Sequence, residues 1–349
     1  MNASGIHVLM TGAGAPGAAG IIHCLRQDPS VRLTVADADP NAIGKYLHDD
    51  FVQIPKGDDA SFTEKLLEIC KSKQISVILP LVTKELFPLS ANKQAFAASG
   101  TNIVVSSEHA IRIANNKTEC YRFLQSKGIE VPSFFVVRTV DEFIHAAAAL
   151  GHPKKSFCFK PSISNGSRGV RIVDDSFDES FHLFHEKPYS LHIGYAHAVA
   201  ILSSRAFPEL LVSDYLPGEE YSVDCLADSG TALLIVPRLR KKTINGISVQ
   251  GTFVNDEAIV DYCRKIIESI GLHGNIGIQL KMTEHHKPLL LEVNPRVQGT
   301  IVAALGAGVN LPLLAVRQAC GEQIEQKDLQ VRWGVGFSRY WKEVFFDAC

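Results

Sequence analysis

The sequence predicts an α/β protein, in which an N-terminal domain built on a parallel sheet is followed by two α+β lobes. Two observations support this prediction. Over the first hundred residues, short apolar runs rich in β-branched residues alternate with helical patterns, which is typical of a parallel sheet covered by helices on both sides. After about residue 132, strand-like segments surround a polar loop that contains glycine. With 349 residues, of which 46% are apolar, the chain can fill the cores of two or three lobes.

The N-terminal domain is expected over residues 1–108. A strand is expected where an apolar run is short and β-branched, and a helix where apolar residues recur at helical spacing. The expected segments are the strands Val8–Thr11, Leu33–Ala36, Val77–Leu81 and Ile103–Val105 and the helices Ala18–Leu25, Phe62–Cys70 and Ala91–Ala98.

The two α+β lobes are expected over residues 109–349. A helix over Lys117–Lys127, ended by Gly128, leads into a small lobe at about residues 133–213, and a C-terminal lobe follows at about residues 214–349. The strands expected in the small lobe are Phe134–Val137, Phe157–Lys160, Val170–Val173 and Leu210–Val212. Those expected in the C-terminal lobe are Tyr221–Leu226, Ala232–Pro237, Ile276–Met282 and Leu289–Val293, with helices over Asp256–Ile270 and after Gly299.

The composition favours a small-molecule partner over a nucleic acid or a membrane. Lys and Arg number 35 against 37 Asp and Glu, so no positive charge excess attracts DNA, RNA or an anionic membrane. The eight cysteines stand singly and are interpreted as reduced thiols in the cytoplasm. We expect no signal peptide, membrane span or lipid anchor, since Cys349 stands last where prenylation needs a cysteine fourth from the end. A cytoplasmic protein is therefore expected, and the sequence is compatible with a homodimer.

A glycine-rich segment, Gly12–Gly17 (GAGAPG), lies between the first expected strand and the first expected helix. Glycines at such a turn let backbone N–H groups approach an anion at the positive end of a helix. Asp37 and Asp39 end the next strand at about the distance expected for a ribose-binding acid, which is the context of a Rossmann-like dinucleotide fingerprint. Three interpretations remain open: dinucleotide binding, a tight turn needed for packing, and a contact of Gly14 with the substrate.

Two lysines and a loop are candidates for binding nucleotide phosphates. Lys117 opens an expected helix, and Lys160 ends an apolar strand, where a solvated lysine is out of place. A polar loop follows Lys160 at once, and its backbone amides can cover a triphosphate. Surface lysines and an ordinary hairpin are the alternative interpretation. The loop residues predicted to contact the nucleotide are Ser167, Arg168 and Gly169.

The segment Asp214–Asp224 has the pattern of a strand that ends, turns at a Pro-Gly pair and resumes. Its functional interpretation is an adenine-binding hinge: the backbone of Tyr215 and Leu216 contacts the base, and Glu220 accepts hydrogen bonds from ribose hydroxyls. Its structural interpretation is a turn between two strands.

A third group of residues has the oxygen atoms that a divalent cation prefers. Residues two apart on a strand share a face, so Glu292 and Asn294 can point at one cation while their apolar neighbours face a core. Gln279, on another expected strand, can be a third ligand. Arg296 follows closely and can balance charge on a transferred phosphoryl group. A polar stripe on a surface sheet is the alternative, but an unpaired Glu292 would be costly among these apolar flanks.

The order of these motifs resembles the ATP-grasp superfamily. A lysine before a helix, a lysine ending a strand, a glycine-containing loop, acid-x-x-x-Gly-x-Glu and Glu-x-Asn-Pro-Arg follow one another along the chain. The sequence is particularly similar to the branch that includes the carbamoyl phosphate synthetase large subunit, biotin carboxylase and amino-acid ligases. The likeness covers nearly the whole chain, since the N-terminal domain is similar to the pre-ATP-grasp domain of that branch.

The resemblance implies ATP and Mg²⁺ as cofactors, with Mn²⁺ as an alternative ion. It implies that Lys117 and Lys160 bind the ATP phosphates, that Asp214, Tyr215, Leu216 and Glu220 hold adenosine, that Gln279, Glu292 and Asn294 bind the metal, and that Arg296 and Lys160 are catalytic. Two departures from the family pattern stand out: Asp214 replaces a more frequent glutamate, and the chain has room for one ATP-grasp unit where carbamoyl phosphate synthetase has two.

The resemblance implies an ADP-forming ligase that activates a carboxylate as an acyl phosphate and joins it to an amine. Bicarbonate activation of the carbamoyl phosphate synthetase or carboxylase type, and a non-catalytic NAD-binding module, are the alternatives. Thr83 and Glu85 lie after the strand Val77–Leu81, where open α/β sheets bind ligands, and are candidate contacts of the nucleophile. Arg238 and Arg240 follow an expected strand and are candidates for an anionic substrate, with a solvated loop as the alternative.

Overall fold

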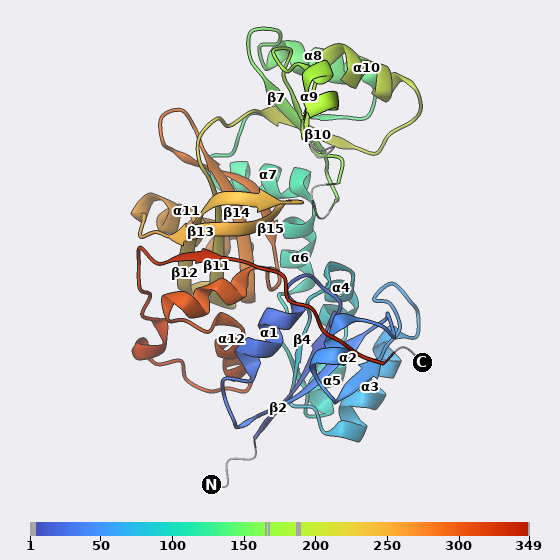
Figure 1. Cartoon of the computed structure of the whole chain (residues 1–349), viewed down its shortest axis with the longest axis vertical. Helices are drawn as coiled ribbons and strands as arrows, with labels where there is room; N and C mark the ends of the chain where they lie inside the picture. Colours follow the sequence, from blue (N-terminus) through green and yellow to red (C-terminus); the bar gives the residue numbers. More distant parts are fainter. Residues whose placement is uncertain (1–4, 165, 167, 186–189, 348–349) are drawn as a thin grey trace.

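The computed structural model describes residues 5–164, 166, 168–185 and 190–347, and its strands form three sheets. We call them the N-terminal sheet (five strands), the small-lobe sheet (five strands) and the large sheet (six strands). In Figure 1 the small lobe and the N-terminal domain lie at opposite ends of the molecule, and the large sheet lies between them. The predicted fold, a parallel α/β domain followed by two α+β lobes, is confirmed.

The N-terminal sheet has the strand order β3-β2-β1-β4-β5, and every adjacent pair is parallel. Alternate residues of a strand face opposite sides, so Val8 of β1 belongs to the core with helix α1 and Leu9 to the core with helix α3. Both faces are covered, which explains why β1 is buried throughout. The elements are β1 Ile6–Thr11, α1 Ala18–Leu25, β2 Val31–Asp37, α2 Ile43–Leu47, β3 Phe51–Gln53, α3 Phe62–Lys73, β4 Val77–Leu79, α4 Thr83–Ala91, α5 Lys93–Ala98 and β5 Asn102–Ile103.

Two helices, α6 (Glu108–Asn115) and α7 (Lys117–Ser126), lead into the small lobe, whose sheet has the order β6-β10-β7-β8-β9. Phe157 and Phe159 of β7 pack with Phe143 of α8 in the lobe's own core. Residues between and after them, Lys160 included, therefore point to the opposite face. The elements are β6 Phe134–Val137, α8 Val140–Ala149, β7 Phe157–Pro161, β8 Arg171–Val173, α9 Glu179–His185, β9 His192–Ile193, α10 Tyr195–Ser203 and β10 Leu210–Asp214.

The large sheet is antiparallel, with the order β15-β14-β11-β12-β13-β16. One face packs Val223, Ile235 and Ile278 against helix α11, and the other face carries apolar residues near one end and polar residues along the rest. The elements are β11 Glu220–Asp228, β12 Thr231–Ile244, β13 Ile247–Phe253, α11 Glu257–Ile270, β14 Gly274–Met282, β15 Pro288–Asn294, the 3-10 helix η1 Ile301–Ala307, α12 Leu311–Ala319, the 3-10 helix η2 Gln326–Leu329 and β16 Gly336–Ser338.

Two local predictions in the C-terminal lobe were wrong. The strand expected to end at Pro237 continues to Ile244, because its polar second half pairs with β13 in a long hairpin. Arg238 and Arg240 therefore lie on a strand and not in a loop. The helix expected after Gly299 is divided into η1 and α12, and the side chain of Asn310 caps the start of α12 by accepting a hydrogen bond from Leu313 N–H.

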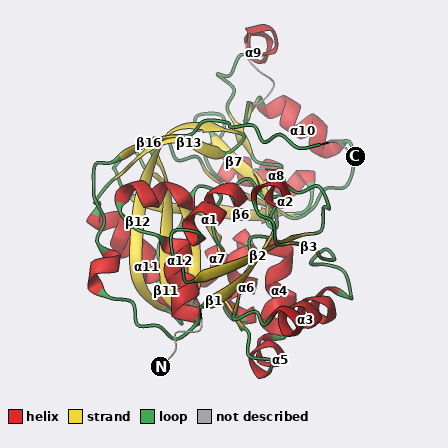
Figure 2. Ribbon diagram, turned by 60° about the horizontal axis from the view of Figure 1, so that its bottom comes forward, coloured by secondary structure: helices red, strands yellow, loops and turns green. Residues whose placement is uncertain are grey.

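The C-terminal segment returns to the N-terminal domain. After β16 the chain crosses the molecule and ends beside α2 (Figures 1 and 2). On the way, Nη2 of Arg339 donates a hydrogen bond to the carbonyl oxygen of Pro16 at 3.3 Å. The ring of Phe346 stacks on that of Tyr46 with 3.9 Å between centroids. The last and the first parts of the described chain are therefore in direct contact; Cys349 lies outside the described residues.

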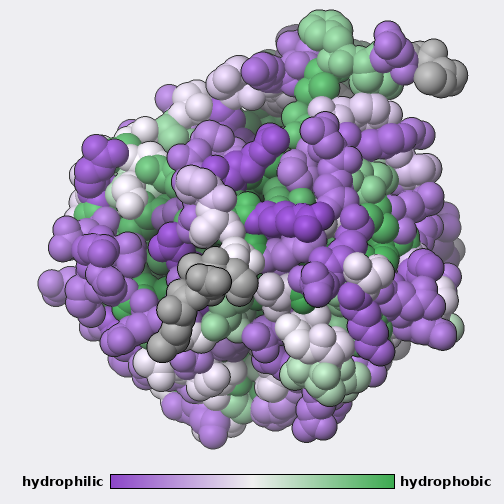
Figure 3. Space-filling model, turned by 90° about the horizontal axis from the view of Figure 1, so that it is seen from below, coloured by the Kyte–Doolittle hydropathy of each residue, from purple (hydrophilic) through white to green (hydrophobic). Residues whose placement is uncertain are grey.

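Polar side chains dominate the face seen from below (Figure 3). Among the described residues no single helix has both the length and the apolar character needed to cross a membrane, and only the bent pair of η1 and α12 passes the same test jointly. Most residues of that pair belong to the protein core.

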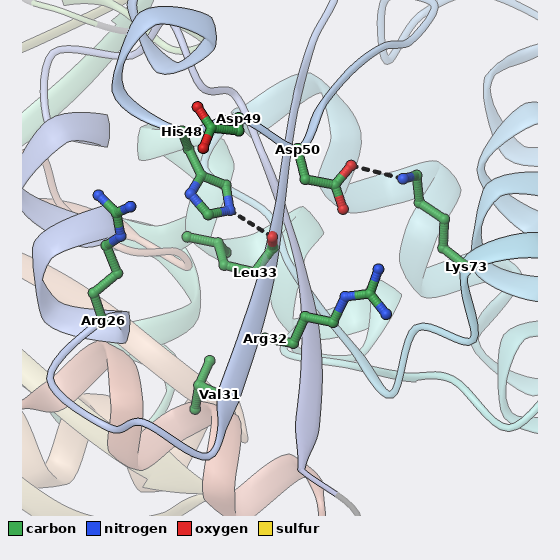
Figure 4. A pocket seen from close by; sticks show the side chains of 8 residues that line it. All are labelled: Arg26, Val31, Arg32, Leu33, His48, Asp49, Asp50 and Lys73. Atoms are coloured by element: carbon green, nitrogen blue, oxygen red, sulfur yellow. Dashed lines mark hydrogen bonds and ion pairs between the residues drawn. The ribbon is translucent and has the colours of Figure 1, made fainter.

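One cavity of the N-terminal domain, about 570 Å³, opens near the start of β2 (Figure 4). Within it Nζ of Lys73 pairs with Asp50 at 2.6 Å, and Nε2 of His48 lies 2.6 Å from the carbonyl oxygen of Leu33. It contains none of the predicted site residues. The lining residues are Arg26, Val31, Arg32, Leu33, His48, Asp49, Asp50 and Lys73.

Candidate functional site

One face of the large sheet carries a line of polar side chains from four strands. Arg238 of β12 is opposite Ser222 of β11. Ser222 is also opposite Gln279 of β14, which in turn is opposite Glu292 of β15. Because directly opposed residues point to the same side of a sheet, these four side chains share one face, and Asn294 joins them two residues after Glu292. We call this the polar face of the large sheet.

Lys117, Lys160 and Glu292 meet at one end of the polar face. Lys117 is the first residue of α7, and its Nζ lies 3.5 Å from Oε2 of Glu292 and donates to the carbonyl oxygen of Ser164 at 2.8 Å. Nζ of Lys160 donates to the carbonyl oxygen of Leu291 at 2.7 Å. Both predicted phosphate-binding lysines therefore reach β15 beside the carboxylate of a predicted metal ligand.

Burial changes the acid–base behaviour of Lys160. Its side chain is buried, with Nζ 3.5 Å from the hydroxyl oxygen of Tyr121 and 5.4 Å from the centre of that ring. Burial, and next the positive charge of Lys117, lower the pKa of Lys160 to about 8. An anion between the two lysines would offset both effects, which suits a polyphosphate.

The predicted metal ligands lie together. Nδ2 of Asn294 donates to Oε1 of Glu292 at 3.0 Å, and Gln279 faces Glu292 across the strand pair. The amide oxygens of Asn294 and Gln279 thus stand beside one carboxylate. Mg²⁺ usually takes one or two carboxylates and completes its shell with water and substrate phosphates, so the residues present fit this ion.

Arg240 lies within the same group, although the sequence suggested a substrate contact. Its guanidinium forms an ion pair with Glu220 through Nη1, which also lies 3.4 Å from Oε1 of Gln279. Its Nη2 donates to the carbonyl oxygen of Gly246 at 2.6 Å, in the turn of the β12–β13 hairpin. The predicted ribose acceptor and a predicted metal ligand are therefore joined by one arginine.

The hinge residues connect the small-lobe sheet to the large sheet. Asp214 ends β10, and its Oδ2 accepts a hydrogen bond from the backbone N–H of Ser133 at 3.1 Å. Nζ of Lys281 lies over the ring of Tyr215, 4.5 Å from its centre, and Leu216 is buried. The chain passes this point just before Glu220, so the hinge lies beside the cluster around Glu292.

The glycine-containing loop follows β7 and supplies the carbonyl oxygen that binds Lys117. Gly169 has a φ of +75°, and a Cβ atom there would lie 2.7 Å from Cγ of Pro161, so the turn requires glycine. Arg168 belongs to the same turn, and Ser167 lies outside the described residues.

Arg296 lies where the large sheet meets the N-terminal domain. Its Nε donates to the hydroxyl oxygen of Thr83, the first residue of α4, at 3.0 Å. Three residues later, Gly299 touches Gly17: a Cβ atom on Gly17 would lie 2.6 Å from Cα of Gly299. The predicted catalytic arginine therefore lies next to both α4 and the glycine-rich segment.

Acidic groups stand beside the glycine-rich segment. Oδ2 of Asp37 accepts a hydrogen bond from the backbone N–H of Gly14 at 2.7 Å. Glu85 is only 4% exposed and accepts a hydrogen bond from the hydroxyl of Thr11. Burial raises the pKa of Glu85 to about 7, and the negative charge of Asp37 acts in the same direction.

Arg238 is fully buried on the side of the polar face nearest the glycine-rich segment. Its Nη2 lies 3.2 Å from Oδ2 of Asp224 and donates to the hydroxyl oxygen of Thr300 at 2.7 Å. Its guanidinium carbon lies 5.3 Å from the centre of the Phe337 ring. Burial raises the pKa of Asp224, although the charge of Arg238 opposes this effect.

Four residues of this site were given no role from the sequence. Tyr121 had a signal, because it follows Lys117 by four residues on a helix and so shares its face. Asp224 also had a sequence signal, because an acid inside an apolar strand is rarely buried without a partner. Thr300 and Phe337 had none, because only the fold brings their segments to Arg238.

Two family models match parts of this chain. Residues 206–337 match the family model described as ATP-grasp in the biosynthetic pathway with Ter operon. Residues 8–104 match the model described as PylC-like, N-terminal domain. Residues 206–337 therefore carry an ATP-grasp domain, as the motifs of the sequence predicted.

A curated relative agrees with this assignment. The chain is similar to the carbamoyl phosphate synthase large chain of Thermomicrobium roseum, with 26% identity over 253 residues. The match covers 68% of this chain and 22% of that protein, so the chain spans only about a fifth of the length of this relative.

Solved structures share the fold over nearly the whole chain. The ADP complex of purK, N5-carboxyaminoimidazole ribonucleotide synthetase, superposes with a TM-score of 0.69 at 13% identity, covering 93% of this chain and 79% of that one. The L-amino acid ligase of Bacillus licheniformis superposes with a TM-score of 0.64 at 16% identity, covering 94% and 78%.

Proposed function

We propose that this protein is an ADP-forming ligase that activates a carboxylate as an acyl phosphate and joins it to an amine. The observation that carries the proposal is the meeting of Lys117, Lys160 and Glu292 at one end of the polar face. Two cations and a carboxylate at one place are what a triphosphate and its metal ion require. The match of residues 206–337 to an ATP-grasp family model and the ligase named among the similar structures support the same reaction class.

The nucleotide lies between the two lobes in this proposal. Lys117 and Lys160 bind the phosphates, the loop with Arg168 and Gly169 covers them, and the hinge at Tyr215 holds adenine. Glu220 accepts from the ribose once Arg240 gives up their ion pair. Gln279, Glu292 and Asn294 would hold Mg²⁺ or Mn²⁺, and the ion would supply positive charge to the phosphate oxygens.

The two substrates meet near Arg296. A carboxylate oxygen attacks the γ-phosphorus, the bond from this phosphorus to the bridging oxygen breaks, and ADP leaves, while the guanidinium of Arg296 stabilises the charge on the transferred phosphoryl group. The amine then attacks the acyl carbon and displaces inorganic phosphate. Arg296 is hydrogen-bonded to Thr83, and Glu85 lies on the same helix, so the acyl phosphate forms beside the N-terminal domain. With its pKa raised to about 7, Glu85 accepts the proton that the attacking amine gives up.

A second candidate function is bicarbonate activation, which the similarity to a carbamoyl phosphate synthase large chain favours. Bicarbonate would then take the place of the carboxylate beside Arg296. The non-catalytic NAD-binding module rests on Gly12–Gly17 alone. Tight NAD binding that is lost in Gly14→Val, without ATP binding, would establish this alternative.

A screen for ADP release tests the ligase proposal. Amino acids, small carboxylates and bicarbonate are supplied with Mg-ATP singly and in pairs, and a ligase releases ADP only when two co-substrates are present together. Arg296→Ala should lower this rate at least about a hundredfold, because one preorganised charge is lost. The matched control, Arg332→Ala on the exposed C-terminal segment, should keep the wild-type rate. Wild-type turnover in Arg296→Ala would contradict the proposal.

A further inference from the structure

The polar face holds a guanidinium that its own protein leaves partly unsatisfied. Arg238 is fully buried, and Nη2 makes its hydrogen bonds to Asp224 and Thr300. Nε and Nη1 of Arg238, and Oδ1 of Asp224, have no hydrogen-bond partner within the described part of the chain. Buried polar groups are nearly always paired, and an incompletely paired buried charge is costly. Three N–H groups of Arg238 are therefore available to an acceptor.

A second arginine stands near Arg238 at the glycine-rich segment. Arg339 follows β16 and donates to the carbonyl oxygen of Pro16. Burial, and next the positive charge of Arg238, lower the pKa of Arg339. No ion pair between Arg339 and a carboxylate occurs among the described residues. Among the described residues, Asp224 is thus the one acid that forms an ion pair with either cation, and it binds Arg238 through a single oxygen.

Backbone segments of both domains close around the two arginines. Gly17 touches Gly299, and the next residue, Thr300, binds Arg238. Helix α1 begins directly after Gly17, without a side-chain cap and without an acid in its first turn, so the positive end of its dipole faces this place. Arg296, which stabilises the charge on the transferred phosphoryl group in the proposed function, lies three residues before Gly299.

We propose that Arg238 and Arg339 form an anion subsite beside the glycine-rich segment. The subsite holds an oxyanion group of one substrate, and this group is not the carboxylate that is activated. The group is a carboxylate or a phosphate, since both accept several hydrogen bonds from guanidinium groups. This inference rests on the proposed ligase function and names its substrate class: one of the two substrates carries an additional anionic group.

Ligand-dependent thermal unfolding of the whole chain tests the subsite. Inorganic phosphate and succinate are titrated separately at constant ionic strength, with saturating Mg²⁺ and a non-hydrolysable ATP analogue so that the nucleotide phosphates occupy Lys117 and Lys160. The wild type should show a saturable rise in Tm with at least one anion, and the anion that binds identifies a phosphate or a carboxylate. Arg339→Gln and Arg238→Lys should raise the half-saturating concentration at least about tenfold.

Arg332→Gln is the matched control, because Arg332 lies on the same C-terminal segment, is exposed and donates to the carbonyl oxygen of Gly306. It should keep the wild-type titration. No saturable rise with either anion in the wild type, or an unchanged titration in Arg339→Gln, overturns the subsite. If Arg238→Lys fails to fold, the anion titration of Arg339→Gln, at a half-buried position, decides whether the subsite exists. The ATP analogue produces its own rise in Tm. Absence of that rise contradicts the ligase proposal, whereas absence of the further rise with the anion contradicts only the subsite.

Discussion

Two groups of residues around the polar face, which we call its nucleotide end and its substrate end, differ in how their charges are balanced. At the nucleotide end, defined by Lys117, Lys160, Glu220, Arg240, Gln279 and Glu292, both carboxylates face a cation: Lys117 lies 3.5 Å from Glu292, and Arg240 forms an ion pair with Glu220. Lys160 donates to a backbone carbonyl oxygen, and Nε of Arg240 has no hydrogen-bond partner within the described residues. At the substrate end, defined by Asp37, Glu85, Arg238, Arg296 and Arg339, Glu85 is bonded to the hydroxyl of Thr11 and Arg238 keeps donors without partners.

This difference indicates what each end does when a ligand arrives. A ligand at the nucleotide end has to exchange existing ion pairs, so metal and nucleotide are expected to favour each other's binding. A ligand at the substrate end completes hydrogen bonds that the protein has not made, which favours substrates with matching charge. Under the proposed function, we therefore expect substrate specificity to depend mainly on the substrate end.

The largest expected effect is at the nucleotide end. Lys160→Met removes a buried charge that contacts the nucleotide phosphates in the proposed function and should lower ATP turnover about a hundredfold to a thousandfold. The rate of ADP release with the best pair of co-substrates measures this. Lys154→Met, an exposed lysine of the same lobe, is the control. Equal rates in Lys160→Met and the wild type would show that the nucleotide phosphates bind elsewhere.

A smaller effect is expected from the buried acid at the substrate end. The pKa of Glu85 is about 7 in the folded protein against an ordinary 4.5, so the folded state binds more protons between these values and stability falls as pH rises through them. Glu85→Gln should remove this loss and stabilise the protein at pH 8 by up to about 3 kcal/mol. Urea unfolding at pH 4.5 and pH 8 measures it.

The exposed Glu64 provides the control for this comparison, and Glu64→Gln should follow the wild type at both pH values. A stability difference between Glu85→Gln and the wild type that is the same at pH 4.5 and pH 8 would show that folding does not shift the pKa of Glu85. The substrate end would then resemble the nucleotide end in being internally compensated.

The smallest effect concerns the ion pairs that a ligand has to exchange. Arg240→Gln frees Gln279 and removes a positive charge near Glu292, so it should raise the affinity for Mn²⁺ in the absence of nucleotide by a few-fold. A Mn²⁺ titration followed by electron paramagnetic resonance measures free and bound ion. Lys241→Gln, the exposed neighbour, is the control. Lower affinity in Arg240→Gln would mean that Arg240 positions the metal ligands and does not compete with the ion.

The nucleotide end could largely be predicted from the sequence, because its signals are local. Strand alternation predicted that Glu292 and Asn294 share one face, and in the structure Nδ2 of Asn294 lies 3.0 Å from Oε1 of Glu292. Lys160 was singled out because an apolar strand does not end in lysine without a reason, and it is indeed buried. The convergence of Lys117 with Glu292, 175 residues later, followed from the family resemblance and not from any local pattern.

The substrate end could not be predicted to the same depth. Arg238 and Arg240 were assigned together, and they lie two residues apart on one strand, yet their partners differ. Arg238 binds Asp224 and Thr300, whereas Arg240 forms an ion pair with Glu220. Their neighbours Asp224, Thr300 and Arg339 come from three separate segments. No sequence periodicity encodes such contacts.

By itself the sequence determined the α/β class, the order of the motifs and the residues that face one another along a single strand, because strand and helix periodicity act over a few residues. Only the tertiary structure decided that Arg240 binds Glu220, that Gly17 meets Gly299, and that Arg238 is buried with unpaired donors. The physical reason is that register between strands and contact between domains depend on packing summed over the whole chain, which no short segment specifies.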